Sequence, residues 1–307
     1  STTVQFNQQF GLKASYNAFL DEEDKLDGEW EDAFFTIDQL PLNFSLRAGR
    51  IFNETSSENN THLHSWRFTN ASLLTSRFMG EEGLLTESVE VQWKLPFDHQ
   101  SQLSLSFGDA VEHSHEEEEI ALPTDIHGEE SNLASSIYTL ALTGRYLQTD
   151  FHQFNYRAHY SEGTNGYGLD GNVYGLNLGY TWRENGQEEG GKELSIQTEW
   201  LQRRFEYVSE DSSIQGKTSE SGLSLSAHYN FGNQWNIGLR HEHLQGSNIL
   251  EETPETTRNS IALTRQFTIN EMVDGHVRLQ YDQLKQEELE DSHTAWLQFQ
   301  FNFGSAH

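Results

Sequence analysis

Apolar and polar residues alternate one by one over many separate stretches of this chain, and this alternation restricts its fold more than any other feature. Near the C-terminus the apolar positions Ala295, Leu297, Phe299, Phe301 and Phe303 are interleaved with Trp296, Gln298, Gln300 and Asn302. Successive side chains of a β-strand point to opposite faces of the sheet. Each such stretch therefore predicts a strand with one apolar face and one largely polar face.

About fourteen stretches of this kind follow one another along the chain. They cover residues 6–20, 29–40, 43–52, 84–95, 101–108, 136–147, 151–161, 173–183, 192–207, 221–231, 235–245, 257–268, 275–284 and 293–303. Most contain about ten residues, the length that crosses a bilayer at a tilt of roughly 45°. The sequence therefore predicts an all-β fold, namely a transmembrane antiparallel up-and-down β-barrel of about fourteen strands.

The connections between these stretches alternate between short and long. Short turns are expected at 41–43, 96–100, 148–150, 232–234 and 269–274, with a longer exception at 184–191; long, acidic loops are expected at 21–28, 53–83, 109–135, 162–172, 208–220, 246–256 and 285–292. Outer-membrane barrels have short periplasmic turns and long extracellular loops, and an even strand count places both termini in the periplasm. Aromatic residues at the expected strand ends are typical of interfacial girdles: Tyr16, Trp93, Trp182, Trp200, Tyr229, Phe231 and Trp235.

Two other fold classes could produce parts of this pattern. A soluble β-sandwich or propeller packs its apolar faces on each other, which favours aliphatic residues over the 11 Tyr and 7 Trp found here. A disordered acidic chain is disfavoured by the 19 Phe that accompany them. No run of apolar residues is long enough for a transmembrane helix, which needs about 18 or more. The bacterial outer membrane is therefore the expected location.

Composition also bounds the organisation of the chain and its partners. With only 4 Pro and no linker-like segment, residues 1–303 are expected to form a single barrel domain, and 304–307 a C-terminal extension or tag remnant. The 48 Asp and Glu outnumber the 19 Lys and Arg, which excludes nucleic acid as a partner. The absence of Cys excludes disulfides and thiolate metal sites. No signal peptide begins at Ser1, as expected of a mature secreted chain.

If the apolar faces meet lipid, the intervening residues line the lumen. The charged members of this inward set are Lys13, Arg47, Arg157, Arg240, Arg258, Arg278, Glu199 and Glu242. A barrel of about eight strands is filled by its own side chains, whereas about sixteen leave an aqueous channel. Fourteen strands predict a narrow, hydrated pore unless a loop plugs it. A second interpretation is that these Arg and Glu residues pair across strands and fill the interior.

Two of the long loops contain pairs of histidines that could hold a metal ion. His113 and His115 are followed by Glu116 within an acidic stretch that also contains His127. In an extended segment, side chains two residues apart lie about 7 Å apart on one side, so both imidazoles can reach one ion. Neighbouring carboxylates suit Zn²⁺, while a solvated run of Glu, or Ca²⁺ and Mg²⁺ bridges to lipopolysaccharide, is the simpler interpretation.

The same His-x-His spacing occurs at two further places. His62 and His64 lie in the 53–83 loop, and His241 and His243 lie at a strand end. No cofactor is required by any of these patterns, and Zn²⁺ or Ca²⁺/Mg²⁺ at the extracellular loops is the expected metal. Catalysis is not expected, since the chain has no Gly-x-Ser-x-Gly, His-Glu-x-x-His or phosphate-loop motif.

One part of the chain resembles a known family. Residues 40–52 read LPLNFSLRAGRIF, residues 61–71 read THLHSWRFTNA, and residues 77–84 read RFMGEEGL. These three segments are similar to proteobacterial outer-membrane proteins labelled zinc-regulated or TonB-dependent-receptor-like. The resemblance implies a metal-responsive outer-membrane barrel in which His62 and His64 match the family's histidine pair. TonB-dependent receptors themselves are plugged barrels of about 22 strands, and this chain has no room for a separate plug domain.

These observations lead to two functional hypotheses. The first is a porin-like channel for small polar solutes or metal ions, whose acidic, His-bearing extracellular loops bind divalent cations. The second is a non-conducting structural barrel or surface receptor that scaffolds a periplasmic or outer-membrane protein partner. In both, outer-membrane lipid and lipopolysaccharide surround the protein.

Overall fold

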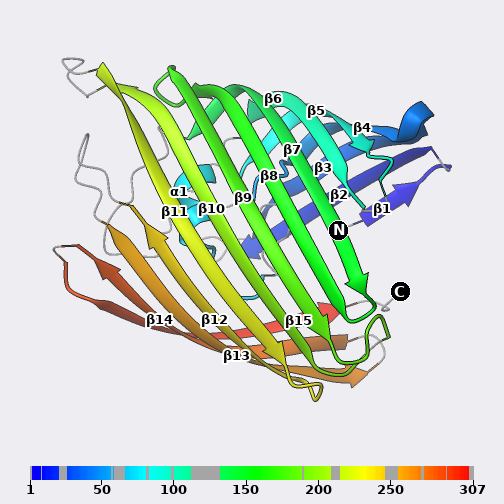
Figure 1. Ribbon diagram of the computed structural model, residues 1–307, viewed down its shortest axis with the longest axis vertical. Coiled ribbons are helices and arrows are strands. Elements are labelled where there is room, and N and C mark those ends of the chain that lie inside the picture. The colour runs from blue at the N-terminus through cyan, green and yellow to red at the C-terminus, as the bar shows by residue number, and fades with distance from the viewer. Residues whose placement is uncertain are drawn as a thin grey trace.

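The computed structural model describes residues 2–7, 9–20, 26–56, 58, 66–80, 83–97, 100–111, 132–188, 190–208, 215–245, 255–270, 273–287 and 289–303. Its strands form a 15-stranded antiparallel sheet in which each strand pairs with its neighbours in sequence. Figure 1 shows this sheet curling around a lumen, with β1 and β15 as its two edges. The predicted all-β, up-and-down barrel architecture is therefore confirmed.

The strands have the following bounds: β1 Thr2–Gln5, β2 Phe10–Leu20, β3 Leu26–Leu40, β4 Phe44–Phe52, β5 Leu85–Lys94, β6 Gln102–Ala110, β7 Leu133–Thr149, β8 His152–Asn165, β9 Asp170–Arg183, β10 Glu193–Val208, β11 Gln215–Asn230, β12 Trp235–Leu244, β13 Thr256–Asn270, β14 Val273–Gln286 and β15 Ser292–Phe303. Strands β2 to β15 correspond in order to the stretches expected from the alternation. A short 3₁₀ turn, Pro41–Asn43, joins β3 to β4.

The N-terminal strand differs from the prediction. Residues 6–20 were expected to form one strand, but the chain reverses before Phe10 and β1 pairs back onto β2, with Thr2 opposite Ala14. The side chain of Asn7 causes the reversal, because its Oδ1 accepts hydrogen bonds from the backbone N–H groups of Gln9 and Phe10 at 2.7 and 2.9 Å. The sheet consequently has one strand more than expected, and Thr2 lies part of the way along β2 instead of at its end.

The middle strands extend further than the prediction on the side of the long connections. Strand β7 begins at Leu133 instead of residue 136, and β11 begins at Gln215 instead of residue 221. The long loop expected at 162–172 is wrong: β8 continues to Asn165, and a tight turn with Gly168 at φ 74° returns the chain to Asp170. Polar residues continue the pairing there, because the backbone ladder does not require an apolar face once the chain leaves lipid.

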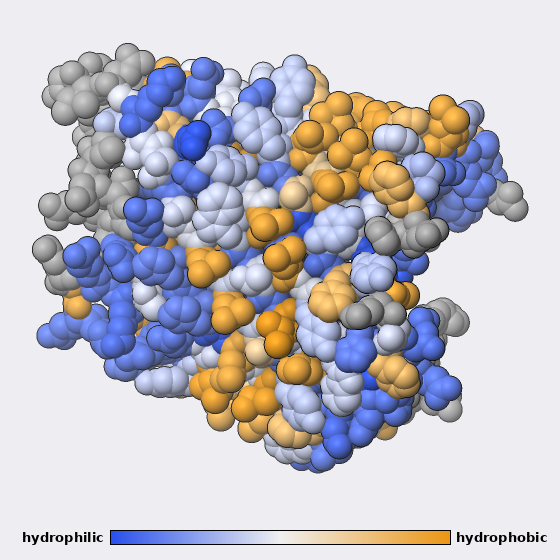
Figure 2. All heavy atoms as spheres, in the orientation of Figure 1, coloured by the Kyte–Doolittle hydropathy of each residue, from blue (hydrophilic) through white to orange (hydrophobic). Residues whose placement is uncertain are grey.

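The sheet is inverted relative to that of a soluble protein. Its large apolar side chains are exposed on the outward face, among them Leu178, Leu225 and Leu263 at 46, 47 and 41 %. Charged side chains of the same sheet are buried on the inward face, among them Glu242 at 0 % and Arg203 at 1 %. Figure 2 shows the hydrophobic side chains in a band across the strands, with hydrophilic ones over the strand ends at the left.

This inversion excludes the soluble sandwich. In a sandwich the apolar faces of two sheets pack on each other, whereas here all described strands belong to one sheet and its apolar face is open. Among the described helices, none has the length and apolar composition needed to span a bilayer.

The segment between β4 and β5 enters the lumen and forms the helix α1, Leu73–Met79. Figure 1 shows α1 inside the curl of the sheet, where it contacts β10, β11 and β12. Ser72 caps the helix by accepting a hydrogen bond from Thr75 N at 3.1 Å. A Cβ at Gly222 would lie 2.7 Å from Leu244 Cδ2 and 3.0 Å from Leu74 Cγ, so glycine at this position allows α1 to approach β11 closely.

A small hydrophobic core fixes α1 near the ends of the strands. Leu74 and Phe78 of the helix pack with inward-facing residues of four strands, namely Val173, Leu201, Leu244 and Leu284. These strand positions interrupt the otherwise polar inward face. Burial of each such side chain stabilises the docked helix by about 1.5–3 kcal/mol.

Candidate functional site

The inserted segment comprises residues 53–84, and its described residues (53–56, 58, 66–80, 83 and 84) are bound to the inward wall through several backbone carbonyl groups. Five arginines from five strands each donate to one carbonyl: Arg157 to Ser56, Arg203 to Arg77, Arg240 to Asn70, Arg258 to Ala71 and Arg278 to Trp66. A segment inside a barrel has no ladder partner for these carbonyls, and buried carbonyls need donors. The planar guanidinium has five N–H donors and suits this role.

Acceptors on the wall bind the backbone N–H groups of the same segment. Glu242 accepts from Leu73 N at 2.8 Å, and Gln280 Oε1 accepts from Thr69 N at 2.8 Å. Asp282 accepts from the Asn70 side-chain amide at 3.0 Å. The wall of β12–β14 thus satisfies both kinds of backbone group in the segment.

Two buried ionic clusters complete the attachment. Glu220 on β11 lies between Arg77 of α1 and Arg203 of β10, at 2.8 and 2.7 Å. Glu242 on β12 pairs with Arg258 at 2.7 Å and with Arg240 at 3.2 Å. Because each carboxylate serves two guanidinium groups, removal of either carboxylate leaves buried positive charge without compensation.

All the residues predicted to line the lumen lie on the inward face, and most have charged partners there. Lys13 pairs with Asp32 at 2.7 Å, Arg47 with Glu90 at 2.6 Å, and Arg157 with Glu54 at 3.0 Å. Arg240, Arg258 and Glu242 form one cluster, while Arg278 donates to Thr264, Gln298 and the Trp66 carbonyl. Pairing within the interior, the second interpretation of these residues, thus describes most of them. Their contact with a passing solute stays a prediction.

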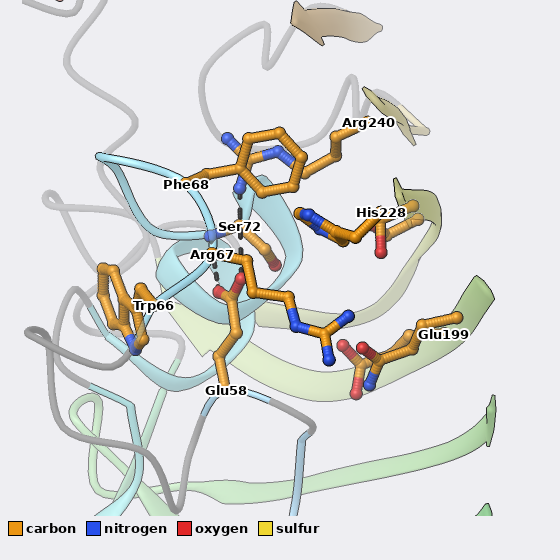
Figure 3. Close-up of a pocket in the computed structure, with 11 residues that line it drawn as sticks. Glu58, Trp66, Arg67, Phe68, Ser72, Glu199, His228 and Arg240 are labelled. Atoms are coloured by element: carbon orange, nitrogen blue, oxygen red, sulfur yellow. Dashed lines mark hydrogen bonds and ion pairs between the residues drawn. The ribbon is translucent and has the colours of Figure 1, made fainter. Parts of the chain in front are cut away.

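A cavity of about 110 Å³ lies between the inserted segment and strands β10–β12. The segment contributes Glu58, Trp66, Arg67, Phe68 and Ser72, and the wall contributes Gln197, Glu199, Ser224, Ser226, His228 and Arg240. Figure 3 shows the Arg67 side chain extending across this space toward Glu199. The cavity therefore combines side chains of both charges, hydroxyl groups and two aromatic rings.

Glu58 connects the cavity to the anchoring network. Its carboxylate accepts a hydrogen bond from Ser72 N at 2.8 Å and lies 3.9 Å from the Arg240 guanidinium. Burial between the segment and the wall raises the pKa of Glu58, and the opposing effect of Arg240 is smaller. Arg67 also has a lowered pKa because it is enclosed in the lumen, but a guanidinium stays charged at neutral pH.

The metal-binding prediction falls mostly on residues that the structure does not describe. His62, His64, His113, His115, Glu116 and His127 all lie outside the described residues. His241 and His243 are described and lie on the outward side of β12, where they contact Asn259 at 2.8 Å and Thr257 at 3.4 Å. Within the described part of the chain, no three His, Asp or Glu side chains are grouped to hold a metal ion.

The sequence did not predict α1 or the residues that hold it. Residues 53–83 were expected to form a loop, and Arg203, Glu220 and Arg67 were not singled out. One signal was present: Ser72 precedes Leu73-Leu74 and Phe78-Met79, a short apolar pattern behind a capping residue. A second signal was the inward position of Leu201, Leu244 and Leu284 in strands whose inward residues are otherwise polar.

The overall fold is similar to several solved outer-membrane proteins. The anion-selective porin from Comamonas acidovorans matches with a TM-score of 0.59 and 10% identity, covering 98% of this chain and 86% of the porin. The outer membrane channel DcaP of Acinetobacter baumannii matches with a TM-score of 0.58 and 11% identity, covering 98% and 82%. A loop-deletion mutant of the Vibrio cholerae outer membrane protein OmpT matches with 0.57 and 8%, covering 97% and 88%.

No protein-family model and no curated protein matches the chain. The resemblance to zinc-regulated or TonB-dependent-receptor-like proteins therefore stays a prediction. At these identities the structural likeness defines the fold and not the solute. The fold of the chain is similar to that of outer-membrane β-barrel porins and channels.

Proposed function

We propose that this protein is a porin-like channel of the bacterial outer membrane, which passes small polar solutes through a lumen narrowed by residues 53–84. The observation that carries the proposal is the inverted sheet, with Leu178, Leu225 and Leu263 exposed outward and charged side chains inward. Lipid is the environment in which an exposed apolar band is stable, and a polar lumen is what a hydrophilic solute requires. Its likeness to porins and channels supports this function and a non-enzymatic role.

The proposed surroundings of the barrel follow from its outward face. Lipid acyl chains contact the apolar band, and lipopolysaccharide contacts the long strand ends beyond it. Both edges of the sheet must pair in lipid, because an unpaired backbone group in hydrocarbon costs several kcal/mol. We therefore expect β15 to meet β1 and β2 in the membrane.

The proposed solute route runs beside the inserted segment. The segment is anchored to β8, β10 and β12–β14 by the five arginine contacts. Strands β2–β5, where Lys13, Asp32, Arg47 and Glu90 face inward, line this route on one side of the segment, and the cavity between the segment and β10–β12 lies on the other side. Solutes moving there meet paired charges of both signs.

Recording from planar bilayers tests the channel. The purified chain, refolded in detergent and added to one side, is expected to insert with discrete conductance steps. Absence of steps at every voltage, while circular dichroism and heat-modifiable electrophoretic mobility show a folded barrel, would overturn the proposal.

One observation favours a non-conducting barrel as the second candidate. The five arginine contacts hold the inserted segment firmly enough to close the lumen if the route beside β2–β5 is narrower than a solute. The barrel would then act as a scaffold or receptor for a periplasmic or outer-membrane protein. This function would be favoured if the wild-type chain shows no conductance steps and a stoichiometric partner protein co-purifies with it in mild detergent.

Binding of divalent cations by the extracellular loops is part of the proposal. The supporting feature is the pair His113 and His115 next to Glu116 in an acidic stretch. Calorimetric titration with Zn²⁺ is expected to show binding that weakens in the His113→Ala/His115→Ala double variant. The matched control is His241→Ala/His243→Ala, with the same spacing on the outward side of β12. Equal Zn²⁺ binding by wild type and the first variant contradicts this part.

A further inference from the structure

Arg67 differs from the other described arginines of the lumen in having neither a carboxylate within ion-pair distance nor a hydrogen-bond acceptor among the described residues, although the charges of Glu193 and Arg183 act on it from further away. Arg47, Arg77, Arg157, Arg203, Arg240 and Arg258 each have a carboxylate within 3.4 Å, and Arg278 has three hydrogen-bond acceptors. No hydrogen bond or ion pair joins the Arg67 side chain to any described residue. Its side chain is accessible from within the lumen although the surrounding wall partly desolvates it, whereas its neighbours Trp66 and Phe68 are 8 and 3 % exposed.

The backbone on both sides of Arg67 is firmly held. Arg278 donates to the Trp66 carbonyl at 2.9 Å, and Gln280 accepts from Thr69 N at 2.8 Å. The Phe68 ring lies between the Arg240 guanidinium, at 4.3 Å from the centroid, and the His228 ring, at 4.9 Å. An unpaired guanidinium is thus presented from a fixed base, which lowers the entropy lost when it binds a ligand.

The cavity next to Arg67 also contains a carboxylate, which complements the positive charge of the guanidinium. Glu199, at 3 % exposure, lies on its far side in Figure 3, with partners of its own. Ser224 and Ser226 of β11 and the His228 imidazole also line the space. The volume of about 110 Å³ admits only a small group, so a larger solute could place just its head group there.

We propose that this cavity is a binding subsite for small zwitterionic solutes of the amino-acid type, with Arg67 holding the carboxylate and Glu199 attracting the ammonium group. The inference rests on the proposed channel function and names the solute class of its narrow region. Arg binds carboxylates through two parallel N–H···O bonds. A purely anionic solute would meet Glu199 and Glu58, and a purely cationic one would meet Arg67. A zwitterion satisfies both signs at once.

The acidic balance of the chain agrees with this solute class. A net charge of −29 opposes the approach of anions, and a solute without net charge avoids that barrier. At the subsite itself, charge-assisted hydrogen bonds to Arg67 then retain the solute for a short time. The solute is therefore expected to bind weakly and saturably at this subsite during its passage, instead of diffusing freely through the lumen.

Single-channel recording with three probes of similar size tests the proposal. L-alanine is the zwitterion, propionate the anion and ethylamine the cation. L-alanine is expected to produce transient blocks of the wild-type channel at lower concentration than either other probe. Arg67→Gln is expected to weaken the L-alanine block by about tenfold or more, because a charge-assisted hydrogen bond is lost. Arg67→Lys, which keeps the charge, is expected to restore part of it.

Arg204→Gln is the matched control. Arg204 lies on the outward face of β10 beside Tyr174, so this substitution removes the same charge at a position outside the lumen. Block by L-alanine that is equal in wild type and Arg67→Gln overturns the proposal. Propionate block as strong as L-alanine block, unchanged in Glu199→Gln, also overturns it in favour of a simple anion site.

The channel function and the subsite can fail separately. A chain that conducts but shows no block by L-alanine retains the channel function and refutes the subsite. For a chain that does not conduct, calorimetric titration of L-alanine into the detergent-solubilised barrel decides: heat that is lost in Arg67→Gln supports the subsite, and no heat in wild type refutes it.

Discussion

Single side chains hold the inserted segment in this barrel, and Glu220 is one of them. It is 3 % exposed and compensates both Arg77 and Arg203, the latter 1 % exposed. Arg203 additionally binds the Arg77 carbonyl at 3.1 Å, so one carboxylate joins α1, β10 and β11. A buried ion pair contributes little net stability, but the loss of one partner strongly destabilises the folded state because the other charge stays buried.

Glu220→Gln is therefore expected to destabilise the folded barrel by about 3–5 kcal/mol, because two buried guanidinium groups lose their counter-charge. Urea unfolding of the refolded chain in lipid vesicles, followed by tryptophan fluorescence, measures the change. The matched control is Glu206→Gln, whose partner Lys217 is largely exposed, and it is expected to change stability by less than about 1 kcal/mol. Equal effects of the two variants would contradict the role assigned to Glu220.

The pKa of Glu58 gives a prediction on pH dependence. Because burial raises this pKa in the folded chain, ionisation of Glu58 disfavours the folded state. The penalty is absent below the unfolded pKa and complete above the folded pKa. Glu58→Gln keeps the acceptor for Ser72 N and is expected to be more stable than wild type at about pH 8, with the difference vanishing near about pH 4. Parallel unfolding series for both chains test this; a difference that grows as pH falls would refute it.

At the scale of elements, the inserted segment is separable from the wall that supports it. Asn53 N donates to Leu84 O at 3.0 Å, so the two ends of the segment lie side by side above β4 and β5. The strands on either side of the segment continue their own pairing, Phe52 with Leu85, without help from α1. The barrel ladder therefore does not depend on the segment.

Replacement of residues 54–83 by a short glycine-rich turn is expected to leave a folded barrel with a single-channel conductance raised several-fold, roughly as expected for a lumen of about fourteen strands without an obstruction. The exposed arginines of the wall would then be hydrated instead of paired with the segment. Heat-modifiable mobility verifies folding, and planar-bilayer recording measures the conductance. Unchanged conductance in a folded variant would show that the segment does not narrow the route.

At the scale of the whole molecule, the apolar band determines where the protein is stable. Leu263 on β13 is 41 % exposed and lies between Ile237 of β12 and Leu279 of β14. Such an outward patch is unfavourable in water and favourable against acyl chains. The location of the chain thus follows from which face of each strand is apolar.

Leu263→Arg is expected to destabilise the barrel in phospholipid vesicles by about 2–4 kcal/mol, the cost of a cation on the lipid face near the bilayer midplane. Leu263→Phe keeps an apolar surface and serves as the control, with a change below about 1 kcal/mol. Urea titration of both variants in vesicles measures the difference. Equal stability of the arginine and phenylalanine variants would mean that this face does not meet lipid.

The strands and their apolar faces could be predicted from local alternation of side chains alone. The alternation around Leu263, or from Ala295 to Phe303, is local: it depends only on the opposite directions of successive side chains. It therefore placed fourteen strands in order and predicted Arg240, Glu242 and Arg258 on the inward side, where they lie. The reversal at Asn7 was missed because the apolar residues on both sides of it are compatible with one continuous strand.

The filling of the lumen could not be predicted in this way, because it depends on contacts between distant parts of the chain. The contacts that hold the inserted segment join residues far apart in the chain, such as Arg240 with Asn70 across 170 positions and Arg278 with Trp66 across 212. Local periodicity does not predict such pairs. A guanidinium that binds a backbone carbonyl can do so whatever the side chain of that residue, so the sequence carries no pattern for the contact. For the same reason Arg67 could be distinguished from the other arginines only after each had been matched to its partner in space.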